Sequence, residues 1–311
     1  MFDTAYSADL TIMEEATELV GRIKNGGKLP LITSCSPAWV KYAETFYPEF
    51  LGNVSSCKSP QQMLGAVIKS YYAKKNNIDP KNIFNVTVMP CTAKKFESER
   101  PELIQNGIAD IDAVLTTREL VKLIRMHGID MAKISEEEND VPFGERSTAG
   151  KLFATTGGVM EAALRTAHHL ITGKELENPV IKEARGFEGR KELEMTIGEL
   201  KLKGAVVSGL GNAKALLEEI KNGRDDIHFI EVMSCPGGCI NGGGQPFGVD
   251  NEKLVTRMKT IYSIDKIENV QKSYQNDSIK SLYTDYLVKP GSKLAHNILH
   301  TSYKEVEGVL K

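Results

Sequence analysis

The sequence predicts an α/β fold in which small mixed or parallel sheets are flanked by helices. Short runs rich in Val, Ile and Phe alternate with helical patterns, as at 29–33, 82–89 and 229–233. Strands that alternate with helices favour parallel pairing. The 311 residues, 41% of them hydrophobic, are enough for one large α/β unit or for two domains.

Hydrophobic periodicity predicts the elements of the first part of the chain. Apolar residues at Leu10, Met13 and Val20 recur at the spacing of one helix face. Gly26-Gly27 then ends that helix. The expected elements are a helix over 7–25, a strand over 29–33, a helix over 60–76, a strand over 82–89, a strand over 111–115 and a helix through Arg125.

Glycines and charges indicate the elements of the second part. Gly157-Gly158 precedes a helical pattern that runs to Arg165, and the N–H groups at the start of such a helix can face an anion. The expected elements are a polar loop over 134–148, the glycine turn and helix over 153–165, a strand over 205–208, a helix to Lys221, a strand over 229–233 and a charged helical tail from about 251.

Composition and charge exclude several classes of protein. The net charge of −2 comes from 39 basic and 41 acidic residues without a basic tract, so nucleic-acid binding has little support. No apolar run reaches membrane-spanning length, and the first residues lack the basic and apolar regions of a signal peptide. Five cysteines, an odd number, favour a cytoplasmic protein with metal-bound or catalytic thiols over a disulfide framework.

Four of the five cysteines stand in tight turns. Cys35 lies in Thr33–Trp39, Cys91 in Met89–Glu97, and a Cys-x3-Cys pair lies in Glu231–Pro246. The last segment also contains five glycines, which indicates backbone that passes close to a bulky group. Thiolates from three turns can together hold an iron–sulfur cluster. A structural zinc site is the simpler interpretation of the pair, but no second cysteine or histidine pair has a matching spacing.

The three cysteine turns, in this order, resemble the signatures of the iron-only (FeFe) hydrogenases. The similarity continues through Asp9–Glu15, Lys58–Gln62, Thr156–Arg165 and Ala295–Thr301, and so extends over essentially the whole chain. The resemblance implies two lobes, about 1–150 and 151–250, with a cluster in the cleft between them. A helical tail over 251–311 would follow.

The resemblance also implies a cofactor: a 4Fe-4S cubane joined through one cysteine to a di-iron subsite with CO, cyanide and a bridging azadithiolate. Cys91, Cys235 and Cys239 would be cubane ligands, and Cys239 would be the bridge to the di-iron unit. Lys94 would hydrogen-bond one cyanide, as suits a flexible point charge. The further residues expected around the subsite are Ser59 and Gln61, for the other cyanide and a carbonyl ligand, and Met89, Met233, Phe153 and Pro60, as the walls of a dry pocket. By pattern alone, the methionines and Phe153 fit an ordinary core.

A proton path is expected along the first helix. Glu15, Glu18 and Arg22 are three and four residues apart, so a helix places them on one face. At about 1.5 Å of rise per residue they span roughly 10 Å, enough to link a buried site with the surface. A solvated face with ordinary charge pairs also explains this spacing. The resemblance favours the path and orders it as Cys35, Glu15, Ser55, Glu18 and Arg22, with Cys35 next to the bridging amine.

The first signature departs from the family pattern at one ligand position. The family has a cubane-ligating cysteine immediately before the proline, whereas this chain has Ser36 before Pro37. A serine alkoxide can bind iron but is a harder ligand, so the cluster is expected to be less stable and its potential shifted. The alternatives are a water-ligated or three-cysteine cluster, ligation by Cys35, or ligation by Cys57. A buried small residue is the simpler interpretation of Cys57.

The chain also departs from the family at its start. It begins after the strand-and-helix stretch that normally opens the family's cluster domain, and it lacks Cys-x2-Cys-x2-Cys relay domains. Either the gene product is truncated or split, or a partner supplies this segment, and one sheet is expected to have an unpaired edge. The resemblance further implies dedicated maturation proteins and an electron partner, which would be ferredoxin or a cluster-bearing subunit.

The leading hypothesis is a catalytic subunit of anaerobic hydrogen metabolism that reversibly reduces protons to hydrogen. The alternative is a hydrogen-sensing or regulatory protein with low turnover, which the altered ligand would suit, although the sequence contains no recognisable sensory domain. A third hypothesis is a non-catalytic protein of iron–sulfur cluster assembly. The complete Met89–Glu97 and Glu231–Pro246 segments disfavour it.

Overall fold

A computed structural model of the chain describes residues 1–137, 140 and 143–306. Within the loop predicted over 134–148, residues 138–139 and 141–142 lie outside the described part. The rest of that loop has no regular structure until a helix begins at Thr148, which confirms the prediction for the described residues. Among the described residues, no helix is both long and apolar enough to cross a membrane.

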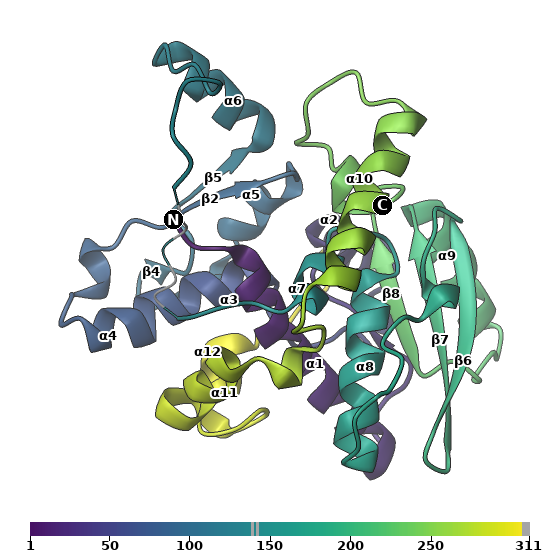
Figure 1. Cartoon of the computed structure of the whole chain (residues 1–311). Helices are drawn as coiled ribbons and strands as arrows, with labels where there is room; N and C mark the ends of the chain where they lie inside the picture. Colours follow the sequence, from purple (N-terminus) through teal and green to yellow (C-terminus); the bar gives the residue numbers. More distant parts are fainter. Residues whose placement is uncertain (138–139, 141–142, 307–311) are drawn as a thin grey trace.

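The larger sheet has four strands in the order β1-β8-β7-β6 (Figure 1). These are β1 (Leu31–Ile32), β8 (Phe229–Met233), β7 (Leu200–Ser208) and β6 (Arg190–Ile197). The first three strands are parallel, and β6 pairs antiparallel to β7. All five residues of β8 are buried, as expected of a strand covered on both faces. Since β1 precedes residue 150, this sheet draws on both predicted lobes, and the lobe boundary stays a prediction.

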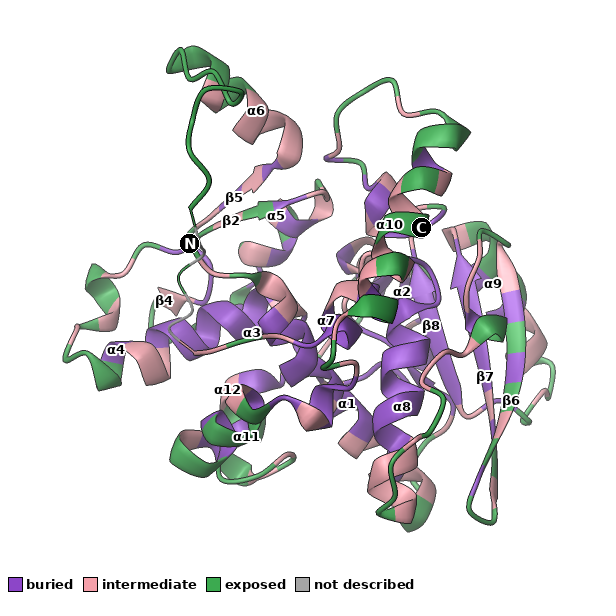
Figure 2. Ribbon diagram, viewed as in Figure 1, coloured by how far each residue is buried: buried purple, intermediate pink, exposed green. Residues whose placement is uncertain are grey.

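Two smaller sheets lie elsewhere in the chain. β2 (Val86–Met89) pairs in parallel with β5 (Ala113–Thr116), and β3 (Ile104–Gln105) pairs antiparallel with β4 (Ile108–Ala109). In the described part of the chain, β2 and β5 each have one strand partner, so each leaves an edge unpaired. Val86 and Val88 of β2 are exposed. The helix α6 (Thr117–Met126), which follows β5, has no buried residue (Figure 2).

Helices cover the larger sheet and join it to the smaller ones. They are α1 (Thr4–Asn25), α2 (Pro37–Phe46), α3 (Pro60–Val67), α4 (Ala73–Lys75), α5 (Ala93–Ser98), α7 (Thr148–Leu152), α8 (Gly158–Thr172), α9 (Leu210–Lys221), α10 (Asn251–Ile267), α11 (Asp277–Leu282) and α12 (Lys293–Leu299). Five-residue π-helices at Ile68–Tyr72 and Tyr283–Leu287 continue α3 and α11. The buried helix α1 contacts α3, α7 and α8 at the centre of the molecule (Figure 2).

Most predicted elements are confirmed within a few residues, including α1, α3 to α4, β2, β5, α6, α8, α9, β8 and the helical tail. Strands β1 and β2 are shorter than predicted, because 80–82 forms a 3-10 turn and Pro30 cannot donate a backbone hydrogen bond. The prediction missed α2, α5, α7, the short strands β3 and β4, and all of β6. In strand β6, Glu192 and Glu194 alternate with Leu193 and Met195, but the strand opens with the charged pair Arg190-Lys191. So many charges obscured the strand pattern.

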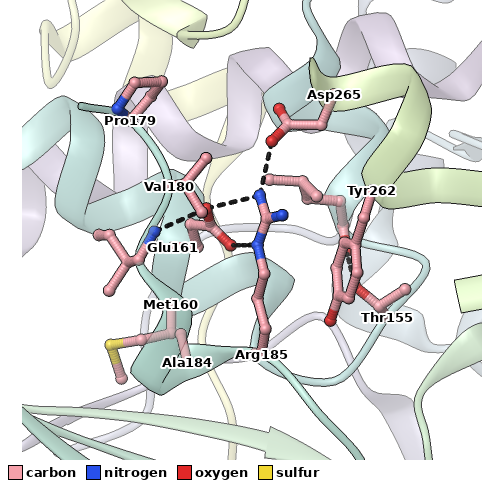
Figure 3. A network of polar contacts seen from close by, with 12 residues as sticks. Thr155, Met160, Glu161, Pro179, Val180, Ala184, Arg185, Tyr262 and Asp265 are labelled. Atoms are coloured by element: carbon pink, nitrogen blue, oxygen red, sulfur yellow. Dashed lines mark hydrogen bonds and ion pairs between the residues drawn. The ribbon is translucent and has the colours of Figure 1, made fainter. Parts of the chain in front are cut away.

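A buried polar network ties α10 to α8 (Figure 3). The fully buried Arg165 of α8 donates to Asp265 of α10 at 2.8 and 2.9 Å and to Glu161 at 2.7 Å. Arg185 bridges the same two carboxylates at 2.6 to 2.9 Å and lies over the Tyr262 ring. Since buried charges are tolerated only when paired, these contacts fix the tail segment on the core.

We therefore expect Asp265→Ala to destabilise the protein by about 3–5 kcal/mol, because it leaves two guanidinium groups short of a partner in a buried site. Asp277→Ala removes an exposed ion pair with Lys280 and serves as the control. The urea midpoint should fall strongly for the first variant and hardly for the second. Equal midpoints would mean that the network does not anchor α10.

Candidate functional site

The glycine-rich turn after β8 packs directly against the turn after β2. A Cβ atom on Gly242 would lie 1.9 Å from the Pro90 carbonyl oxygen, and one on Gly244 would lie 2.8 Å from the Cys91 nitrogen. The Gly244 N–H donates to that same carbonyl oxygen at 2.9 Å. These glycines therefore allow two backbones to meet, and the contact brings Cys91 to the cysteine pair of the second turn.

A third turn closes on the same place. Gly238 has a φ of +89°, and a Cβ atom there would lie 2.7 Å from the Thr156 nitrogen. Thr156 N–H donates to the Gly237 carbonyl at 3.2 Å, and Ile240 N–H donates to Ala154 at 2.9 Å. The glycine turn is thus held between the Cys91 turn and the start of α8.

These turns surround one cavity of about 560 Å³. The predicted site residues on its wall are Cys35, Ser36, Pro60, Gln61, Met89, Cys91, Lys94, Phe153, Met233, Cys235 and Cys239. The remaining predicted residues, Ser59, Glu15, Ser55, Glu18 and Arg22, lie behind the wall. The structure therefore brings the cysteines of all three turns to one space, together with the apolar residues expected to keep it dry.

The three thiols predicted as ligands influence one another. Burial raises the pKa of Cys239 to about 12, and the charges of Cys91 and Cys235 add to this increase. Burial also raises the pKa of Cys235, with Cys91 contributing. Thiols that raise one another's pKa on the wall of a single cavity suit a metal cluster, since coordination replaces their protons with positive charge. The donor set and the cavity therefore fit an iron–sulfur cluster.

Glu97 gathers three predicted cofactor contacts behind the cavity wall. Lys94 Nζ lies 2.9 and 3.0 Å from its carboxylate oxygens and 3.0 Å from the Cys35 carbonyl oxygen. Ser59 Oγ donates to Glu97 at 2.8 Å, and Gln61 Nε2 donates at 3.3 Å. Glu97 is buried, so it fixes a lysine ammonium group at the rim of an apolar cavity.

The anion at the start of α8 is a side chain of the protein itself. Glu231 of β8 is fully buried and accepts hydrogen bonds from Gly157 N–H at 2.6 Å and Met160 N–H at 2.7 Å. Burial raises its pKa to about 7, and these N–H groups and Lys191 oppose the increase. The sequence predicted that the N-terminus of α8 could face an anion. The Glu231 carboxylate takes this position and so links the start of α8 to β8.

Cys35 and Ser36 both reach the cavity but have different partners. Burial raises the pKa of Cys35 strongly; the Glu15 charge adds to this, as does Cys239, while Lys94 opposes it. Ser36 Oγ lies 2.8 Å from Ser234 Oγ, which adjoins the glycine turn. Cys35 therefore stands between the thiol group and the carboxylates of α1, and Ser36 faces the opposite turn.

The predicted relay residues form a line from Cys35 to the surface. Burial raises the pKa of Glu15 to about 8, and the Glu18 charge adds to this, while a hydrogen bond from Ser55 opposes it. Ser55 Oγ also donates to Glu18 Oε2 at 3.0 Å. Arg22 donates to Glu18 at 2.5 and 3.1 Å, and its side chain is 17% exposed. The structure therefore groups Glu15, Ser55, Glu18 and Arg22 near Cys35, and the proton path through them stays a prediction.

Cys57 lies apart from the cavity. It is fully buried in a core with Met63, Leu64 and Leu299, and its Sγ lies near Glu18 and His300. This position favours the interpretation of Cys57 as a buried residue over its ligation of the cluster.

Sequence reasoning assigned no role to Glu97, Glu231 or Ser234. Glu97 and Glu231 do stand at the ends of the two longest cysteine segments, and Glu231 interrupts the apolar run 229–233. A lone carboxylate in that position is a signal of a buried hydrogen-bonding centre. The Ser234 contact with Ser36 depends on tertiary structure and leaves no such signal.

Comparison with known proteins agrees with this geometry. Residues 1–243 match the family described as iron only hydrogenase large subunit, C-terminal domain, and residues 251–306 match iron hydrogenase small subunit. The chain is 48% identical to iron hydrogenase 1 of Clostridium pasteurianum, over 98% of this chain and 54% of that protein. It spans little more than half the length of this and another hydrogenase relative, a subunit of an NADP-reducing hydrogenase from Solidesulfovibrio fructosivorans.

A second group of relatives has a different name. A cytosolic iron–sulfur cluster assembly factor of Xenopus tropicalis is 32% identical over 99% of this chain and 67% of its own length. Among solved structures, an apo FeFe-hydrogenase variant from Chlamydomonas reinhardtii superposes with a TM-score of 0.87 at 39% identity, covering 99% of this chain and 84% of that one. The cysteine turns, the fold and these matches together show that the chain belongs to the iron-only hydrogenase family.

Proposed function

We propose that this chain is the catalytic domain of a hydrogenase that reversibly reduces protons to molecular hydrogen. The observation that carries this proposal is the line of Glu15, Ser55, Glu18 and Arg22 behind Cys35. A cluster that only transfers electrons does not need a proton path. In this chain these residues lie behind Cys35 at the wall of the cavity that holds the three thiols, which supports a proton path there.

The protein's own residues would move the proton. Cys35 Sγ holds it at the cavity wall, since the raised pKa keeps this thiol protonated at neutral pH. Glu15 has a pKa near 8 and can therefore exchange a proton with a thiol or with Glu18 at physiological pH. The Ser55 hydroxyl contacts both carboxylates, and the Arg22 guanidinium holds Glu18 at the surface.

Other residues would hold the cofactor. Cys91, Cys235 and Cys239 would ligate a 4Fe-4S cubane, with Cys239 as the bridge and Ser36 as the fourth ligand. Lys94, Ser59 and Gln61, grouped around Glu97, would hold the cyanide and carbonyl ligands of a di-iron subsite with an azadithiolate bridge. The residues proposed to exclude water are Pro60, Met89, Phe153 and Met233. When bound, this cofactor would supply the metal centre for hydrogen chemistry and would pass on the electrons delivered by a partner.

Partners follow from this function. Electrons would come from ferredoxin or from a cluster-bearing subunit. A relative is itself named as a subunit of an NADP-reducing hydrogenase, which supports a multisubunit setting. We further infer dedicated maturation proteins and a cytoplasmic location.

Two other functions deserve comparison with this one. A hydrogen sensor would suit the altered ligand at Ser36, but it does not require an intact relay. An assembly factor is supported by relatives at about 30% identity, such as the 32% match in Xenopus tropicalis, whereas the hydrogenase relatives reach 45–48%. The catalytic function therefore has the stronger support.

The test is to mature the protein anaerobically and measure infrared bands of iron-bound CO and cyanide together with hydrogen evolution from a strong reductant. A hydrogenase should show both the bands and fast turnover. Bands with slow turnover would indicate the sensor. A cubane without these bands would indicate the assembly protein and would exclude the proposal.

Loss of the proposed proton donor should be severe. We expect Cys35→Ala to lower hydrogen evolution by about 10²–10⁴-fold, the usual contribution of a positioned acid, while iron content and the CO and cyanide bands stay unchanged. Thr17→Ala provides the control, since its hydroxyl donates within α1 to Met13 and lies outside the relay. Wild-type rates in the Cys35 variant would contradict its role.

Restoring a thiolate at the fourth ligand position should strengthen the cluster. We expect Ser36→Cys to raise the iron retained per chain after exposure to a chelator, because thiolates bind iron–sulfur clusters more tightly than alkoxides. Turnover should rise with iron content. The control is Ser234→Ala, which removes the hydroxyl partner of Ser36 without adding a ligand. If Ser36→Cys leaves both quantities unchanged, Ser36 does not limit the cluster.

A further inference from the structure

Three metal-ligating side chains of different kinds meet outside the cavity. Glu18 of α1, Cys57 and His300 each offer one ligand atom, and these atoms lie within 4.8 Å of one another. Cys57 Sγ is 3.9 Å from Glu18 Oε2 and 4.0 Å from His300 Nδ1. A thiolate and an imidazole around tetrahedral zinc are about 3.6 Å apart, so small side-chain adjustments would suffice.

The backbone holds these ligands in place. Cys57 and His300 face each other across an antiparallel β-bridge, in which Thr301 N–H donates to Ser56 and Lys58 N–H donates to Leu299, at 2.7 and 2.8 Å. Cys57 is fully buried, and the side chains of His300 and Glu18 are 4% and 15% exposed. The group is thus preorganised and still open to solvent on the Glu18 side.

A second carboxylate orients the imidazole. His300 Nε2 lies 3.0 Å from Glu14 Oε2, and Glu14 is itself fixed by Tyr283 Oη at 2.5 Å and Gly291 N–H at 2.8 Å. With the proton on Nε2, Nδ1 has a free lone pair, and it lies 2.8 Å from Ser56 Oγ and 4.0 Å from Cys57 Sγ. A buried carboxylate behind a histidine is the usual outer-shell support of a metal-binding imidazole.

Three carboxylates near Cys57 favour a cation, whereas the Arg22 guanidinium, which is paired with Glu18, opposes one. The carboxylates Glu18, Glu15 and Glu14 all raise the pKa of the Cys57 thiol, in addition to the larger effect of its burial. A divalent metal would displace the thiol proton and offset this negative charge. Ser56 Oγ now bridges Glu18 and His300 at 3.1 and 2.8 Å, and its hydroxyl can rotate aside or serve as the fourth ligand.

We propose that Glu18, Cys57 and His300 form a binding site for a divalent zinc-type cation. The mixed set of sulfur, nitrogen and carboxylate oxygen suits zinc better than the hard cations magnesium and calcium. Glu18 also belongs to the relay, so a bound cation would occupy the oxygen that accepts the Ser55 proton. Zinc would therefore inhibit hydrogen evolution, and this consequence rests on the proposed function.

Zinc binding is tested first, without reference to activity. Cluster-loaded protein is dialysed against zinc chloride, and zinc and iron are counted per chain. We expect the wild type to bind one zinc ion per chain, and its zinc X-ray absorption spectrum should show a single sulfur ligand. The zinc affinity of Cys57→Ser and of His300→Gln should be at least tenfold lower. Glu14→Gln should weaken binding by about 10–100-fold through the histidine.

His296→Asn is the matched control. This exposed imidazole stacks on His300 with ring centroids 4.5 Å apart, yet it belongs to neither the ligand set nor the relay. Zinc affinity should be unchanged in this variant. A loss equal to that of His300→Gln would indicate a surface histidine site and overturn the proposal.

Two other results would also overturn the proposed site. One is equal zinc binding by the wild type, Cys57→Ser and His300→Gln. The other is zinc bound by several sulfurs with release of iron, which would indicate attack on the cluster. If Cys57→Ser loses its cluster, the zinc affinity of His300→Gln and the number of sulfur ligands on zinc in the wild type still test the proposed site.

The activity arm separates the two proposals. Zinc should inhibit wild-type hydrogen evolution, and Cys57→Ser should need at least tenfold more zinc for the same fractional inhibition of its own rate. Zinc bound at this site without inhibition would support the metal site and contradict the role of Glu18 in the relay. Absence of turnover in any variant would count against the proposed function and leave the binding result intact.

Discussion

The site depends on the close approach of two backbones. The turn after β8 meets the turn after β2 where Gly242 and Gly244 lie against Pro90 and Cys91, at distances that leave no room for a side chain. This contact brings the thiol of Cys91, at the end of the smaller parallel sheet, close to Cys235 and Cys239, which follow the larger one. Substitution of these glycines would separate the two sheets and disperse the donor set. The role of these glycines is thus to allow the two turns to pack together and form the cavity, and not to make room for a ligand.

Buried carboxylates complete this arrangement. Glu231 joins β8 to the first turn of α8, and Glu97 fixes Lys94 at the cavity rim. Glu15 and Glu18 extend from the cavity to the surface along α1, the helix at the centre of the molecule. Each carboxylate is buried or nearly so, and each has specific donors, which is the condition under which buried charges persist. The buried carboxylates therefore both stabilise the fold and form the proposed proton path. Cys35 lies between these carboxylates and the three thiols.

The sequence predicted the fold class and the grouping of the site residues, but it missed several elements and contacts. Cysteine turns, glycine runs and the spacing of Glu15, Glu18 and Arg22 are local features, and the structure brings these residues together as expected. The strand β6 was missed because its charged residues disguise the alternation, and α2 because Pro37 hides a helix start within a cysteine turn. The roles of Glu97 and Ser234 depend on contacts between distant segments. The sequence signalled an anion at the start of α8, but only the tertiary structure identifies it as Glu231.

The central claim is that three cysteines hold the cluster while Cys35 remains a free thiol beside the relay. Anomalous diffraction at the iron edge, from crystals of the matured protein, tests it most directly. We expect iron in the cavity within bonding distance of Cys91, Cys235 and Cys239, with Cys35 Sγ unligated and facing Glu15. Iron bonded to Cys35, or located away from this cavity, would contradict it.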